Sequence, residues 1–139
     1  MVTVQYAYEI SYAHDPFTGD PFPILPLQVT NLSNPGIALD VNAYLDSGAQ
    51  RSLFDGWIAT SLGLDLLSGQ ALSYGSLGGI IQGRLHQVRL SHFDLGEFDL
   101  EIGFSENPIR RNLLGRDFFN LIQIGFRERY LTFYVTPTP

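Results

Sequence analysis

The sequence predicts one mostly-β domain over residues 1–139, built from short strands with one or two short helices. Apolar or alternating segments of strand length recur along the chain and are separated by Pro, Gly, Asn and Asp turn signals. Only one segment, residues 54–62, has a convincing helical pattern. The 139 residues, of which 45% are hydrophobic, are enough to bury a core without disulfides or a structural metal.

The first third of the chain predicts extended structure. Residues 3–12 roughly alternate apolar and polar side chains and predict a strand, and residues 14–21 carry Pro, Gly and Asp and predict a turn. Residues 22–31 resume as an extended segment whose prolines exclude a helix and favour an edge strand. After a second turn at 34–36, residues 37–46 predict a strand that ends on an acid.

The middle of the chain holds the helix and two hairpins. The helix over 54–62 (FDGWIATSL) is followed by Gly63, which is well placed to end it. Residues 71–90 then predict two strands around a glycine-rich bend, and residues 86–105 predict a further hairpin. The β-structure therefore resumes directly after the helix.

The two ends of the chain complete the predicted domain. A short helix is expected around residues 116–121, and residues 127–135 predict a closing strand. Residues 136–139 predict a frayed tail. Residues 1–20 form an N-terminal extension in which we expect a strand.

Composition and charge exclude several classes of function. The chain has a formal net charge of −6 and no cysteine. Disulfide frameworks, thiolate metal sites and cysteine nucleophiles are therefore excluded, and an acidic surface disfavours a phosphate-binding face. The three histidines are scattered and form no metal-binding motif. We expect no cofactor, no metal, no nucleic-acid partner and no membrane partner, and a cytoplasmic protein or a domain of a larger one.

Asp46 is the acid whose place in the sequence is typical of a catalytic carboxylate. The apolar run 43–45 leads directly into Asp46, which Ser47 and Gly48 follow. A carboxylate at the end of an apolar strand is partly desolvated, which disfavours its charged form, and a glycine after it allows a tight turn. Two such carboxylates that share one proton can polarise a water and protonate a leaving group. The alternative is an ordinary turn acid that caps its own loop.

The residues around Asp46 narrow these alternatives. The stretch LDSGAQRSLF (45–54) resembles the active-site loop of the retropepsins, the retroviral-type aspartic proteases. Their pattern has two apolar residues, then Asp-Thr/Ser-Gly-Ala, then Thr or Ser three residues later. The Ala-Gln pair at 49–50 is closer to the cellular branch, the DNA-damage-inducible proteins with a retropepsin-like domain. The resemblance implies catalytic roles for Asp46, Ser47 and Gly48, substrate contacts for Leu45 and Ala49, and a supporting role for Ser52.

A second segment resembles the same family. NLLGRDFF (112–119) is similar to the strand that crosses beside the catalytic loop in retropepsins and is followed by a short helix. The family's arginine there pairs with an acid just after the loop alanine, where this chain has Gln50 and Arg51, so Asp117 or another acid is a candidate replacement. The resemblance implies a substrate contact for Leu113 and supporting roles for Leu114, Gly115, Arg116 and Asp117.

A third segment resembles the flap that retropepsins close over their substrate. YGSLGGIIQGR (74–84) has several glycines between two strands, and glycine keeps many backbone states open. A plain glycine-rich hairpin is the structural alternative. If the segment is a flap, its tip lies at Leu77, Gly78 and Gly79. The resemblance then implies substrate contacts from Gly75, Ser76, Leu77, Gly78, Gly79 and Ile80, with Ile81 among the neighbouring pocket residues.

The chain contains a single Asp-Ser-Gly sequence, and this number has a consequence for the oligomeric state. The retropepsin mechanism needs two such acids, so the resemblance implies a homodimer with the active site on its two-fold axis, in which the strand at 127–135 is a candidate for the dimer sheet. The implied function is aspartic endopeptidase activity on an extended polypeptide with apolar residues beside the cleaved bond. One alternative is a non-catalytic dimer of the same fold that binds peptides or scaffolds other proteins. Another is a domain that is active only within a larger protein.

Overall fold

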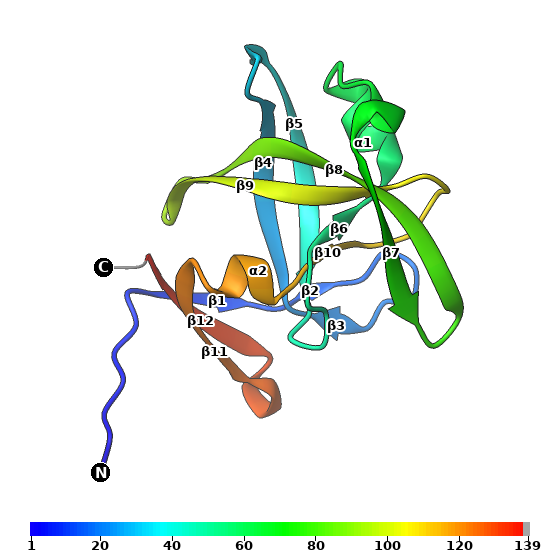
Figure 1. Ribbon diagram of the computed structural model, residues 1–139. Helices are drawn as coiled ribbons and strands as arrows, with labels where there is room; N and C mark the ends of the chain where they lie inside the picture. Colours follow the sequence, from blue (N-terminus) through cyan, green and yellow to red (C-terminus); the bar gives the residue numbers. More distant parts are fainter. Residues whose placement is uncertain (138–139) are drawn as a thin grey trace.

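Strands dominate the computed structural model, which describes residues 1–137 (Figure 1). The largest sheet has seven strands in the order β4-β5-β10-β6-β9-β8-β7. Their bounds are β4 (Ile24–Asn31), β5 (Asn34–Leu45), β6 (Leu53–Phe54), β7 (Gln70–Ser76), β8 (Gly79–His92), β9 (Gly96–Ser105) and β10 (Asn112–Leu114). The prediction of a mostly-β chain is confirmed.

A further pairing closes this sheet into a barrel. β4 pairs with β5 along its length, and its residues 28–31 also pair with residues 88–91 of β8. The prediction that 22–31 is an edge strand is therefore wrong for its second half. Pro26 lies in the half that has only β5 beside it, where a residue without an N–H costs no ladder hydrogen bond.

One hydrophobic core fills the interior of the barrel. Its largest completely buried side chains are aromatic or branched aliphatic, and burying one of them stabilises the fold by about 1.5–3 kcal/mol. They include Phe54, Phe104, Phe118, Phe133, Leu25, Leu62, Leu90 and Ile102.

The turn between β4 and β5 lies two residues earlier than the predicted turn at 34–36. Asn31 explains the shift because its Oδ1 accepts the backbone N–H groups of Ser33 (2.8 Å) and Asn34 (3.2 Å). A side chain that hydrogen-bonds two residues ahead makes its own turn. The segment 34–36 is therefore already the start of β5.

The predicted helix at 54–62 is confirmed as α1 (Gly56–Ser61). It begins later than predicted because Asp55 is its N-cap and accepts the N–H of Trp57 at 2.8 Å. Gly63 follows the last turn with φ +80° and donates its N–H to Thr60, as predicted for the residue that ends the helix. The second helix, α2 (Arg116–Phe119), is also confirmed. No helix within residues 1–137 is long enough to cross a membrane.

The two ends of the chain meet in a smaller sheet of order β1-β12-β11 (Figure 1). Its strands are β1 (Tyr8–Ser11), β11 (Ile122–Arg127) and β12 (Thr132–Pro137). The predicted single strand at 127–135 is wrong at its start, because residues 128–130 form a 3₁₀ turn and Leu131 takes a left-handed φ of 51°.

The predicted N-terminal strand and C-terminal tail differ from the structure in length. Only residues 8–11 of the predicted strand at 3–12 form β1. Residues 136 and 137, predicted as part of a frayed tail, pair with β11, and residues 138–139 lie outside the described part. Residues 1–7 form no helix or strand, and the chain after β1 forms a small hairpin of β2 (Ala13–His14) and β3 (Pro21–Phe22).

Candidate active site

Asp46 is placed by the end of β5. Residues 43–45 are buried and pair in parallel with β10, Ala43 opposite Asn112 and Leu45 opposite Leu114. The next residue continues the pattern, because the N–H of Asp46 donates to the carbonyl of Leu114 at 2.9 Å. The backbone of Asp46 is therefore anchored to the interior of the barrel while its side chain leaves the strand.

A tight turn directly follows Asp46. The carboxylate Oδ1 of Asp46 accepts the N–H of Gly48 at 2.9 Å, and the carbonyl of Asp46 accepts the N–H of Ala49 at 3.1 Å. The other carboxylate oxygen, Oδ2, has no hydrogen-bond partner among residues 1–137. The half-buried carboxylate is thus oriented through one oxygen and keeps the other available.

The far end of the catalytic loop, which we define as residues 46–52, is held by the segment after β10. Ser52 Oγ donates to Asp117 Oδ1 at 2.7 Å, and the Ser52 N–H donates to Asp117 Oδ2 at 3.0 Å. The N–H of Gly115 in turn donates to Ser52 Oγ at 3.0 Å. A Cβ on Gly115 would lie 2.6 Å from the carbonyl oxygen of Ala49, so only glycine allows this approach.

Arg116 has no carboxylate partner of the expected kind. Within residues 1–137 no acid lies within 4.0 Å of its guanidinium, and the neighbouring Asp117 is engaged by Ser52. The backbone of Arg116 still contributes, because its N–H donates to the carbonyl of Ala49 at 2.9 Å. The loop is therefore fastened by a serine and a carboxylate rather than by an ion pair to Arg116.

The glycine-rich segment forms the hairpin of β7 and β8, which projects from the barrel in Figure 1. Ser76 pairs with Gly79, so Leu77 and Gly78 form the turn, and the Ser76 hydroxyl donates to the carbonyl of Gly79 at 2.9 Å. Leu77 is fully exposed and Ile80 is 71% exposed. Two exposed apolar side chains at the tip of a hairpin are unusual unless something covers them.

A cleft of about 730 Å³ lies between the catalytic loop and this hairpin. Its walls include nine of the residues that the sequence singled out. These are Asp46, Gly48, Ala49, Gly75, Ser76, Leu77, Ile81, Leu113 and Arg116. The three segments that resemble retropepsin motifs therefore meet at one place in the structure.

The remaining candidate residues lie around this cleft rather than in its walls. Leu45 is 6% exposed and packs in the core, and Ser47 is exposed on the outside of the loop. Gly78, Gly79 and Ile80 belong to the outer part of the hairpin. Behind the catalytic loop lie Ser52, Leu114, Gly115 and Asp117.

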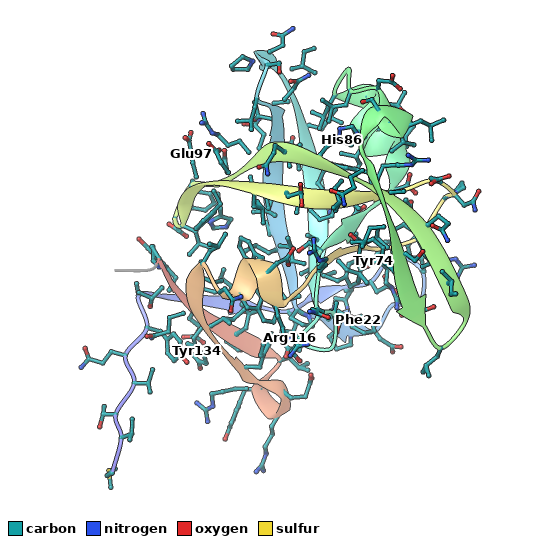
Figure 2. The ribbon with its side chains drawn as sticks, in the orientation of Figure 1. Phe22, Tyr74, His86, Glu97, Arg116 and Tyr134 are labelled. Atoms are coloured by element: carbon teal, nitrogen blue, oxygen red, sulfur yellow. The ribbon has the colours of Figure 1, made fainter. Side chains whose placement is uncertain are left out.

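Sequence reasoning missed several wall residues, of which Tyr74 is the most informative. Its hydroxyl donates to the carbonyl of Ser52 at 3.3 Å, and burial raises its pKa to about 12. The ring points from β7 toward the barrel (Figure 2), where a Cβ on Gly83 would lie 2.8 Å from it. The period of two along a strand places Leu72 on the same face as Tyr74, and this signal could have identified both. The other missed wall residues are Gln50, Arg51, Leu53 and Ser73.

The closed barrel, the Asp-Ser-Gly loop and the flap-like hairpin define a retropepsin-like aspartic protease fold. A family model described as aspartyl protease matches residues 30–118, well over half of the chain, so the chain belongs to the aspartyl protease family. No curated protein sequence matches it.

Solved structures give the same fold. A retropepsin-like aspartic protease from Rickettsia conorii is similar with a TM-score of 0.65 and 16% identity, covering 98% of this chain and 100% of that one. EIAV protease, solved in complex with the inhibitor HBY-793, is similar with a TM-score of 0.53 and 18% identity, covering 71% of this chain and 86% of that one. The predicted resemblance to retropepsins is confirmed, while the closeness to the DNA-damage-inducible branch stays a prediction.

Proposed function

We propose that the protein is an aspartic endopeptidase that works as a homodimer, with one Asp46 from each subunit at the active site. One observation carries the proposal. Among residues 1–137, Asp46 is the only carboxylic acid in the walls of the cleft, and the hairpin that would cover a substrate lines the same cleft. The aspartic-protease mechanism uses two carboxylates at once, one that activates the water and one that protonates the leaving group, so a second chain must supply the other.

The chemistry follows from the pairing of two carboxylates. Two like charges at short distance cannot both ionise freely, so the pair holds one shared proton over a range of acidic pH. The ionised Asp46 takes a proton from a water, whose oxygen attacks the carbonyl carbon of the peptide bond. The protonated Asp46 gives its proton to the departing nitrogen, so the C–N bond breaks and the pair regains one proton overall.

β11 provides an edge through which two subunits could pair. Within residues 1–137 it has β12 on one side and no strand on the other, because the sheet order is β1-β12-β11. An unpaired edge presents a row of N–H and C=O groups that another strand can satisfy. β11 also directly follows α2 and the segment that fastens the catalytic loop (Figure 1). This edge therefore replaces the segment 127–135 as our candidate for the dimer sheet.

The walls of the cleft indicate the kind of substrate. Apolar side chains from β6, the hairpin and β10 line it, and the strands of the hairpin can offer backbone groups to an extended chain. We therefore expect an extended polypeptide with apolar side chains on both sides of the cleaved bond. The apolar wall residues are Leu53, Leu72, Leu77, Ile81 and Leu113.

The experiment compares hydrolysis of an unfolded protein substrate by the wild type and by Asp46→Asn between pH 3 and pH 8. Asp40→Asn is the matched control, because Asp40 is an exposed acid on β5, the strand that leads to Asp46. We expect the wild type and the control to cleave at acidic pH, and Asp46→Asn to lose at least about a thousandfold in rate.

The other outcomes are equally informative. Cleavage at equal rates by the wild type and Asp46→Asn would contradict the proposal, because the chemistry would then reside elsewhere. A folded, dimeric wild type that binds apolar peptides without cleaving them would favour a non-catalytic peptide-binding protein of the same fold.

A further inference from the structure

Asp15, in the N-terminal extension, is an acid buried without being part of the cleft. It lies between β2 and β3, and its side chain is completely buried. Its Oδ2 accepts hydrogen bonds from the Thr18 N–H (3.0 Å), the Thr18 hydroxyl (2.9 Å) and Arg111 Nη2 (2.7 Å). Its Oδ1 accepts the hydroxyl of Tyr44. Both oxygens are therefore engaged, as a buried charge requires.

Two partners of Asp15, Tyr44 and Arg111, lie close in sequence to the residues that place the catalytic loop. Tyr44 is in β5, two residues before Asp46. Arg111 directly precedes β10, whose Leu114 carbonyl holds the N–H of Asp46. One carboxylate thus joins the two adjacent strands that together place the backbone of Asp46.

Aromatic rings fix the geometry of this cluster. The guanidinium carbon of Arg111 lies 4.8 Å from the ring centre of Phe22 in β3 and 5.3 Å from that of Tyr44. The rings of Phe22 and Tyr44 meet edge to face at 5.8 Å. A guanidinium held between rings and bound to a carboxylate has little freedom to move. The hairpin of β2 and β3 therefore packs against the end of β5 through the Asp15 cluster, which consists of Asp15, Phe22, Tyr44 and Arg111.

The cluster keeps its charge in acid. The bond to Arg111, opposed by burial and helped by Tyr44 and Thr18, holds the pKa of Asp15 well below its usual range. Burial and the bond to Asp15 raise the pKa of Tyr44, which therefore remains a phenol donor. The contacts consequently persist over the acidic range in which a pair of Asp46 carboxylates would share one proton.

We propose that Asp15 is a positioning residue for catalysis, which acts through Tyr44 and Arg111 on the strand ends that carry Asp46. The N-terminal hairpin 13–22 is then part of what sets the reaction rate. The inference rests on the proposed endopeptidase function. Asp15 joins Tyr44 and Arg111 ahead of the loop, and Asp117 fastens the exit of the loop at Ser52.

The test uses Tyr44→Phe, which removes one hydroxyl and leaves the ring and the other bonds of Asp15, with Asp15→Asn as the stronger change. The control is Asp99→Asn, because Asp99 also binds an arginine through both oxygens (2.7 and 3.0 Å to Arg89) but is exposed and, within residues 1–137, forms no side-chain hydrogen bond to β5, β10 or the loop. For each variant, kcat and KM are measured together with hydrogen exchange of the Asp46 and Gly48 amides.

A positioning role predicts a specific set of results. Tyr44→Phe lowers kcat by about tenfold or more with little change in KM, because misplacing a catalytic group costs rate more than binding. Exchange of the Asp46 and Gly48 amides becomes faster in the same variant, while amides in β8 and β9 keep their rates. Asp99→Asn changes none of these quantities.

Two results would overturn the inference. Tyr44→Phe with wild-type kcat and wild-type exchange at Asp46 would show that the cluster does not position the loop. Faster exchange throughout the barrel would show a general loss of stability instead. If the wild type itself does not cleave, the proposed function fails, and the exchange measurement still decides whether Asp15 orders the loop. If Asp15→Asn does not fold, Tyr44→Phe alone decides.

Discussion

The catalytic loop and the hairpin of β7 and β8 face each other across one cleft but are held in opposite ways. The loop is anchored at Asp46, Ala49 and Ser52 by backbone and side-chain hydrogen bonds to β10 and to the segment after it. The tip of the hairpin has a fully exposed Leu77 and a largely exposed Ile80. Under the proposed function, the loop carries catalytic groups, which need fixed geometry, and the hairpin is a cover that must open for a long substrate. The difference in anchoring fits these two proposed roles.

The glycines of the two regions show the same contrast. Gly115 is needed for close approach, because a Cβ there would lie 2.6 Å from the carbonyl oxygen of Ala49. A Cβ on Gly75 would meet no atom within 4 Å. Glycine therefore allows tight packing behind the loop, whereas Gly75 in the hairpin stands in open space.

The largest expected effect comes from adding a methyl group behind the loop. Gly115→Ala forces the Ala49 carbonyl away from its place, and overpacking against backbone costs about 3 kcal/mol of unfolding free energy. We expect the variant to lose most of its proteolytic activity as well, because Ala49 belongs to the same turn as Asp46. Urea unfolding and hydrolysis assays measure the two effects.

Gly75→Ala is the matched control for this substitution. The methyl group finds open space, so stability should stay within about 0.5 kcal/mol of the wild type. If both variants were equally stable, the close packing behind the loop would not be what holds it.

A smaller effect is expected from the hydroxyl that links the two family motifs. Ser52→Ala leaves the N–H of Gly115 and one oxygen of Asp117 without this partner, at a cost of about 1–3 kcal/mol. Ser73→Ala removes an exposed hydroxyl bond to Gln82 in the hairpin and should cost at most about 0.5 kcal/mol. Equal melting temperatures for the two variants would argue against the Ser52 anchor.

The tip of the hairpin should respond more to conformation than to packing. Gly79 has a φ of +123°, which side-chain-bearing residues rarely adopt, so Gly79→Ala should cost about 1 kcal/mol or more of local stability. Hydrogen exchange at the tip should become faster while exchange at Asp46 stays unchanged. A simultaneous change at Asp46 would mean that the two regions are not independently held.

The smallest expected effect is a change in how the free energy of unfolding depends on pH. Below about pH 3.9 Asp15 becomes protonated in the unfolded chain, whereas Arg111 keeps this carboxylate ionised in the folded chain. The contribution of Asp15 to the free energy of unfolding therefore falls as the pH falls toward the lowered pKa. Asp15→Asn should therefore flatten the slope of unfolding free energy against pH between pH 2 and pH 5. Residues 70–83 contain no acid or histidine, so the hairpin adds nothing to this slope. Parallel curves for the two proteins would contradict this account of Asp15.

Local signals in the sequence were enough for much of the fold and for the centre of the site. The apolar strand before Asp46, the glycine turn after it, the capped helix α1 and the glycine-rich hairpin each depend on neighbouring residues, and each was predicted. The turn at Asn31 was misplaced because a Pro-Gly pair nearby gave a stronger signal than one asparagine side chain.

Contacts between distant segments could not be predicted in this way. Nothing near Asp15 in the sequence indicates that it binds Arg111, 96 residues away, or that the hydroxyl of Tyr44 points to it. The second neighbour of β4 and the turn that divides β11 from β12 likewise depend on how the barrel closes. Such pairings are set by tertiary packing, which a single sequence shows only through resemblance.

The most direct test of a shared active site is the activity of mixed dimers. Wild-type chains are mixed with increasing amounts of Asp46→Asn chains, and the subunits are allowed to exchange. The rate of hydrolysis is then measured and divided by the total concentration of dimer, which gives the specific activity. If each dimer needs both Asp46 residues, specific activity follows the square of the wild-type fraction and falls to about a quarter at equal mixing. A fall to about half, in proportion to the wild-type fraction, would mean that each chain works alone and would contradict the dimeric active site proposed for this protein.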